Sequence, residues 1–128
     1  RLLFYSFISV IVVATVNFVA NFLYLYWTVW WFDNVTHFLG GLSMGLLWFW
    51  VWSRFYRLSD PKFGNALFVI IVLVLIVGVG WEIFEYIFDI ANPTGSETYW
   101  QDTNYDLVAD TLGAIVASFI IYKNKFHV

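Results

Sequence analysis

The stretch "VIIVLVLIVGVGWEIFEYIFD", residues 69 to 89, joins a long apolar run to three carboxylates. Its first thirteen residues carry no charge, and Glu82, Glu85 and Asp89 then follow in close succession. An apolar segment of roughly 20 residues can cross the hydrocarbon core of a bilayer as a helix. The stretch therefore predicts a membrane-spanning helix that carries acids into its last turns, with no nearby lysine or arginine to pair with them.

The composition of the whole chain indicates a membrane protein. Hydrophobic residues make up 62% of the sequence and charged residues 12%, and the mean hydropathy is +0.77. Soluble domains carry about 25% charged residues, roughly twice this share. The chain has no cysteine, which excludes disulfides and thiolate metal sites. The net charge of -3 gives no basic surface for nucleic acid, so we expect no nucleic-acid partner.

The hydropathy pattern predicts four spans within a single transmembrane domain, residues 1–128. The predicted spans are about 2–27, 35–52, 66–90 and 105–122. The longest joining segment, "ANPTGSETYWQDTN", contains the turn signals Asn-Pro and Thr-Gly. The predicted fold class is an all-α integral membrane protein with four transmembrane helices and the lipid bilayer as its surroundings.

The basic residues predict how the chain is oriented. All six lie at the N-terminus, between spans two and three, or at the C-terminus: Arg1, Arg54, Arg57, Lys62, Lys123 and Lys125. By the positive-inside rule, both termini and the middle loop are cytoplasmic, which makes this an N-in/C-in, multi-pass protein of the inner cell membrane. Eight of the nine acids then map to the outer half, and only Asp60 lies on the basic side.

Helical spacing directs the polar residues toward one another. At about 100° per residue, Glu82, Glu85 and Asp89 share a face of the third span. In the fourth span Asp106 and Asp110 share a face, which Asp102 joins if the helix starts early enough. Asp33 and His37 begin the second span four residues apart, and Asn17, Asn21, Tyr24 and Thr28 form a stripe in the first. Ionisable residues within spans avoid lipid, so we expect a polar pocket, open outward, at the centre of the four helices.

Five glycines are expected to let the helices approach closely enough to form this pocket. They are Gly40, Gly41, Gly78, Gly80 and Gly113.

Some of the acids also have a purely structural explanation. Asp33 could cap the start of the second span, and Asp102 and Asp106 could interact with the dipole at the start of the fourth. Glu82 and Glu85 resist this explanation because they lie inside the end of a span, where the helix dipole disfavours carboxylates. A charge near mid-bilayer costs about 2.5–3.5 kcal/mol. Either these groups hold protons, or a bound cation neutralises them.

Three short motifs occur in order along the chain. They are D-x-x-x-H at Asp33 and His37, W-E-x-x-E at Trp81, Glu82 and Glu85, and D-x-x-x-D-x-x-G-A at Asp106, Asp110, Gly113 and Ala114. This order resembles the VanZ-like family of small bacterial membrane proteins, which is linked to glycopeptide-antibiotic tolerance. It is similar also to a related group of uncharacterised inner-membrane proteins. The resemblance covers about residues 30 to 118 and implies a fold and a site location.

The chain departs from the VanZ pattern at three site positions. Asn34, Glu85 and Asp110 stand where that family has Lys, Gln and Asn, and the arginine that precedes its last helix is missing. The site is therefore more acidic and less basic than the family pattern.

The leading hypothesis is a divalent-cation pocket that binds or acts on a lipid-linked or envelope substrate. Carboxylates with one imidazole suit Mg, Mn, Ca or Zn. The candidate metal ligands are Asp33, His37, Glu82, Glu85, Asp106 and Asp110. Whether the protein is an enzyme stays open, because no nucleophile motif is present and Ser43 and Ser118 are interpreted as packing residues.

Two alternatives remain. One is a non-catalytic subunit or assembly factor of a larger membrane complex. The other is a proton or cation transporter, which the apolar segments "LLWFW" and "VIIVLVLIV" of the inner half disfavour, although a homo-oligomer could provide a path between subunits.

The orientation can be tested directly because the chain has no cysteine of its own. We expect the variant Glu97→Cys to react with a membrane-impermeant thiol reagent added outside intact cells. Asp60→Cys is the matched variant on the basic side and should react only after the membrane is opened. The opposite pattern would overturn the predicted orientation.

Overall fold

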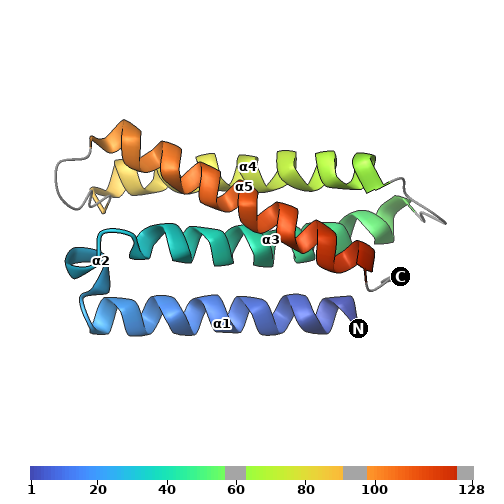
Figure 1. The fold of residues 1–128 in the computed structure, drawn as a ribbon, viewed down its shortest axis with the longest axis horizontal. Helices are drawn as coiled ribbons and strands as arrows, with labels where there is room; N and C mark the ends of the chain where they lie inside the picture. Colours follow the sequence, from blue (N-terminus) through green and yellow to red (C-terminus); the bar gives the residue numbers. More distant parts are fainter. Residues whose placement is uncertain (57–62, 91–97, 124–128) are drawn as a thin grey trace.

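The computed structural model describes residues 1–56, 63–90 and 98–123, and all of its regular elements there are helices. They are α1 (Leu2–Phe22), α2 (Leu25–Thr28), α3 (Phe32–Tyr56), α4 (Phe63–Phe88) and α5 (Tyr99–Lys123). Four of them, α1, α3, α4 and α5, are long and apolar enough to span a membrane, which confirms the predicted four-helix fold. The long helices run alternately up and down, so the start of α1 and the end of α5 lie at one end of the bundle (Figure 1).

The first helix ends earlier than the sequence pattern predicted. Helix α1 stops at Phe22, whereas the predicted span continued to Trp27. Tyr24 has a φ of 56°, the left-handed conformation, and therefore breaks the helical path. The short helix α2 follows this turn and joins α1 to α3 at one end of the bundle (Figure 1). Hydropathy does not reveal this bend, because residues 23–27 are all apolar or aromatic and could continue a membrane span.

The two helices that carry aspartates begin earlier than predicted. Helix α3 begins at Phe32, so Asp33 lies within its first turn instead of capping it. Helix α5 begins at Tyr99 because Thr98 and Gln101 form a capping box. The Thr98 amide donates to Gln101 Oε1 at 2.9 Å, and the Gln101 amide donates to Thr98 Oγ1 at 3.4 Å. Asp106 is therefore about two turns inside the helix and away from its positive end.

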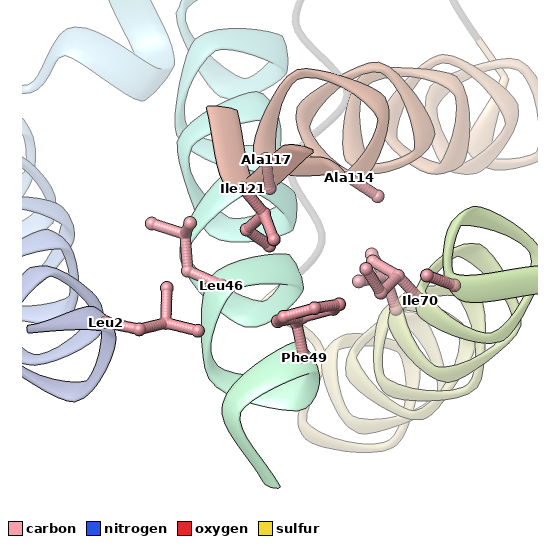
Figure 2. Packing of buried hydrophobic residues seen from close by; sticks show 9 residues of the cluster. Leu2, Leu46, Phe49, Ile70, Ala114, Ala117 and Ile121 are labelled. Carbon is pink, nitrogen blue, oxygen red and sulfur yellow. The ribbon is translucent and has the colours of Figure 1, made fainter. Parts of the chain in front are cut away.

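An apolar core fills the half of the bundle nearest the chain ends. Leu46 and Phe49 of α3 meet Ile70 of α4 and Ala117 and Ile121 of α5 (Figure 2). Leu2 brings the start of α1 into the same cluster. Across the described residues, the backbone of α1 lies close to α3 and α2, and none of its Cα atoms is within 8 Å of one in α4 or α5. The opposite half of the bundle is left for polar residues.

Glycines bring α3 and α5 into direct backbone contact. A Cβ added at Gly41 would overlap the backbone of Asp110, and one at Gly113 would overlap the Phe38 carbonyl and the Leu42 amide. This approach supports the predicted role of Gly41, Gly78 and Gly113, whereas a Cβ at Gly40 would meet only Asp110 Oδ1, at an ordinary contact distance of 3.9 Å. The prediction for Gly80 is wrong, because that residue faces open space; Gly45, which meets Ala117, was not predicted.

We expect Gly113→Ala to destabilise the fold, since the new methyl group would meet backbone atoms that cannot move without separating α3 from α5. Overpacking of this kind costs about 1–3 kcal/mol. The matched variant Gly80→Ala has open space and should be neutral or stabilising by up to about 1 kcal/mol through helix propensity. Thermal unfolding in detergent measures both. Equal melting temperatures for Gly113→Ala and the parent would contradict the close crossing.

Candidate metal centre

His37 on α3 lies at the middle of a cluster of acidic side chains. Its Nε2 atom is 3.8 Å from Asp33 Oδ1, 3.9 Å from Glu82 Oε1 and 4.0 Å from Asp106 Oδ2. Its other ring nitrogen, Nδ1, is 3.5 Å from Asp110 Oδ2. Helices α3, α4 and α5 each contribute to this centre, which joins residues more than seventy positions apart in the chain.

Glu85 is the sixth predicted residue, and it joins the same centre. One ligand atom from each of His37, Glu82 and Glu85 lies within 4.8 Å of the others, and the same holds for Asp33, His37 and Asp106. Glu85 is also held from the side, because Trp81 Nε1 donates a 2.8 Å hydrogen bond to Glu85 Oε1. The structure therefore brings all six predicted residues together around one imidazole.

Two residues that were not predicted orient Glu82. Thr103 Oγ1 donates a 2.7 Å hydrogen bond to Glu82 Oε2, and the Tyr99 hydroxyl donates to the Glu82 carbonyl at 2.9 Å. Thr103 precedes Asp106 by three residues and Asp110 by seven, so all three share one face of α5. This helical spacing is the sequence signal that could have identified Thr103. These bonds tie the acid-bearing turn of α4 to the first two turns of α5.

Two carboxylate oxygens in the centre have no hydrogen-bond partner. Glu82 Oε1 and Asp106 Oδ1 are buried and unpartnered, in residues that are only 5% and 1% exposed. Buried polar atoms are nearly always hydrogen-bonded, so each exception needs an explanation. Among the described residues, His37 is the only basic side chain paired with these carboxylates. The carboxylates thus surround one imidazole in two overlapping groups of three, and these two oxygens accept no hydrogen bond there.

The remaining acids of the sequence analysis lie outside this centre. Asp89 follows the end of α4, has a φ of 54° and is exposed. Asp102 is half-buried in the first turn of α5. Glu97 and Asp60 fall outside the residues that the structure describes. The centre is consequently a subset of the acids, drawn from α3, α4 and α5.

The predicted polar stripe of α1 is only partly correct. Asn21 Nδ2 donates to Asn17 Oδ1 at 2.8 Å, and the Tyr26 hydroxyl donates to the same atom at 3.0 Å. Burial raises the pKa of the Tyr26 hydroxyl. Tyr24 and Thr28 are exposed and do not extend the stripe, because the turn at Tyr24 changes the direction of the chain.

A cavity of about 690 Å³ adjoins the centre. It lies against α3 between α1 and α4, and Asp33, His37, Glu85 and Asp110 line its polar part. A cavity lined by the predicted polar residues is therefore present, but it lies between α1 and α4 and takes only Asp110 from α5, so it is not at the centre of all four helices. The side of the membrane to which it opens stays a prediction, as does the N-in/C-in orientation.

The fold and this centre define a small multi-pass membrane protein with a buried acidic and histidine cluster. The chain belongs to the DUF2238 family, described as predicted membrane protein, whose sequence profile matches residues 2–125. An uncharacterized protein of Thermotoga maritima is 28% identical over 106 residues, which cover 82% of this chain and 55% of the relative. The chain thus spans about half the length of that relative. No solved structure matches the chain.

These matches agree with the predicted similarity to uncharacterised small membrane proteins. The resemblance to the VanZ-like family is a separate statement and stays a prediction.

Removing an unpartnered buried carboxylate should not harm the metal-free protein. In the presence of a chelator, we expect Asp106→Asn to melt at the same temperature as the parent or several degrees higher, because it relieves repulsion among the acids. Asp89→Asn is the matched control, since it removes an exposed acid and Asn tolerates the same positive φ. A clear loss of stability in Asp106→Asn alone would mean that the protein itself satisfies this carboxylate.

Proposed function

We propose that the protein binds a divalent cation between His37 and the carboxylates of Asp33, Glu82 and Asp106, with Glu85 as a further ligand. The observation that carries the proposal is the ring of three carboxylate oxygens 3.8–4.0 Å from one imidazole nitrogen. These separations are too long for direct hydrogen bonds. With bonds of about 2.0–2.6 Å, neighbouring ligands of one ion lie roughly 3–4 Å apart and opposite ones roughly 4–5 Å, so the separations fit oxygens that share an ion with this nitrogen.

The unpartnered oxygens support the same proposal. A cation beside His37 would satisfy Glu82 Oε1 and would offset several negative charges that no lysine or arginine of the described chain pairs with. Asp106 would reach it first through Oδ2, the oxygen that faces His37. Oxygen ligands with one nitrogen suit Mn²⁺ or Zn²⁺ better than Ca²⁺ or Mg²⁺, which take oxygen ligands almost exclusively.

Asp110 would act on His37 and not on the ion. It faces Nδ1, the ring nitrogen opposite the other three carboxylates. Metal-binding histidines usually donate their second N–H to a carboxylate, which orients the ring and increases its basicity as a ligand. Gly78 makes this position possible, because a Cβ there would lie 2.5 Å from Asp110 Oδ2. In the sequence-based hypothesis Asp110 was a ligand and Asp33 could orient the ring; the geometry favours exchanging these roles.

The ion would give the cavity its chemistry. A bound divalent cation acts as a Lewis acid toward a carbonyl or phosphoryl oxygen, and Asp33, His37 and Glu85 line the cavity that such a group would enter. The function that this supports is binding of a lipid-linked or envelope substrate, or chemistry on it, at the ion.

The two alternatives are less well supported. The apolar core of Leu46, Phe49, Ile70 and Ile121 fills the other half of the bundle, which disfavours an ion path through one chain. A role as a subunit of a larger membrane complex predicts that other chains copurify in fixed ratio.

The metal proposal is tested by thermal unfolding in detergent, with chelator or with added Mn²⁺, Zn²⁺, Mg²⁺ or Ca²⁺. An ion at 100 times its Kd should stabilise the native state by about 2.7 kcal/mol. Glu82→Gln and Glu85→Gln should lose most of this gain, whereas Asp89→Asn should keep it. Elemental analysis of the purified parent should find about one ion per chain.

A different outcome of the same experiment would contradict the metal proposal. If no ion raises the melting temperature, and the double variant Glu82→Gln with Glu85→Gln is as stable as the parent, the acids hold protons instead. The metal proposal would then be withdrawn.

A further inference from the structure

We propose that the cavity between α1 and α4 receives one acyl chain of a phosphate-bearing membrane lipid, whose head group reaches the acidic centre. The position of the head group rests on the proposed metal function, whereas the position of the chain rests on the cavity alone.

The inner part of the cavity has apolar walls, which come from two helices on either side of α3. Val10, Val13 and Ala14 of α1 face Val74 and Val77 of α4 across the cavity. In the described chain no Cα atom of α1 lies within 8 Å of one in α4, and α3 forms the floor between the two helices. Val10 and Val77 are also more than one-third exposed, which indicates that the cavity opens sideways, toward lipid. Its volume of about 690 Å³ lies in the range of pockets that enclose small molecules.

The cavity has the length of one membrane leaflet. The lining residues of α1 run from Val10 to Asn21, a rise of roughly 16 Å at 1.5 Å per residue. The lining part of α4 from Val74 to Glu85 has the same length. The hydrocarbon core of a bilayer is about 30 Å thick, so one leaflet contributes about half of it. A lipid chain from one leaflet would therefore fit along the cavity with its head at the polar end.

Ser43 is an independent sign that the occupant carries a polar atom. Its hydroxyl lines the cavity, is 2% exposed and has no hydrogen-bond partner. The other serines of the described chain all donate to a carbonyl of their own helix; they are Ser6, Ser9, Ser53 and Ser118. Ser43 lies about 9 Å from His37 along α3, toward the apolar end. An ester or amide carbonyl at the top of an acyl chain would accept its hydrogen bond.

The charge of the centre determines the kind of head group. The cavity lining contains no lysine or arginine, so a phosphate could not be held by protein cations. With the ion in place, a phosphate oxygen could complete its coordination, since hard divalent cations favour such ligands. The occupant is thus an acyl lipid with a phosphate near its carbonyl, which is the chemistry of a phospholipid.

Native mass spectrometry of the metal-loaded protein in detergent tests the proposal, with dioleoyl phosphatidylglycerol as the added probe. The parent should retain one phospholipid per chain under conditions that strip surface lipid. Val77→Trp should fill the cavity and abolish retention. Val79→Trp is the matched control, because Val79 is exposed on the same helix and does not line the cavity. It should bind as the parent does.

Two further arms locate the polar contacts. Ser43→Ala should weaken retention about fivefold, the effect of one lost hydrogen bond. Chelator, or His37→Gln, should weaken it further while leaving the Val77→Trp result unchanged. Glycerol phosphate and inorganic phosphate should not displace the lipid at equal concentration, because they lack the chain.

The outcomes separate the two proposals. Equal retention by Val77→Trp and the parent would overturn the lipid site, even if the ion binds normally. If retention depends on Val77 but not on chelator, the chain site stands and the role of the ion at the head group is wrong.

Discussion

The whole centre depends on the distance between α3 and α5. Gly41 and Gly113 allow the two backbones to touch, and a methyl group at either position would overlap main-chain atoms of the opposite helix. Small residues at such crossings are what lets helices approach closely in membranes. His37 lies one turn from Gly41, and Asp110 lies one turn from Gly113, so the contact places imidazole beside carboxylate. A wider crossing would leave the acids of α5 apart from the histidine.

The features that sequence could predict were those with a strong periodic or compositional signal. Four spans follow from length and hydropathy, and the six candidate residues follow from helical spacing, because charged groups in lipid must face the interior. The turn at Tyr24 was missed because left-handed backbone at a tyrosine has no signal in hydropathy. Thr98 and Gln101 form a capping box that marks the early start of α5, and this short signal was overlooked beside a polar loop.

The role of each residue in the metal centre was harder to predict than which residues belong to the centre. Which ring nitrogen of His37 faces Asp33 and which faces Asp110 depends on how α3 and α5 cross, and spacing along one helix contains no such information. Gly80 was predicted to have the same role as Gly78, yet the structure places Gly78 against Asp110 and leaves Gly80 open. Sequence identified the participants, and only the packing of the helices assigned their positions.

The hydrogen bonds between α4 and α5 have a mechanical consequence. Tyr99 and Thr103 both donate to Glu82, and the capping box sets where α5 begins, so the two helices cannot slide along each other without breaking these bonds. Membrane proteins adapt to bilayers of different thickness by tilting or by shifting their helices. Here a change of thickness would tilt α4 and α5 as one body. The carboxylate of Glu82 would then keep its separation from those of Asp106 and Asp110 in thin and thick membranes alike.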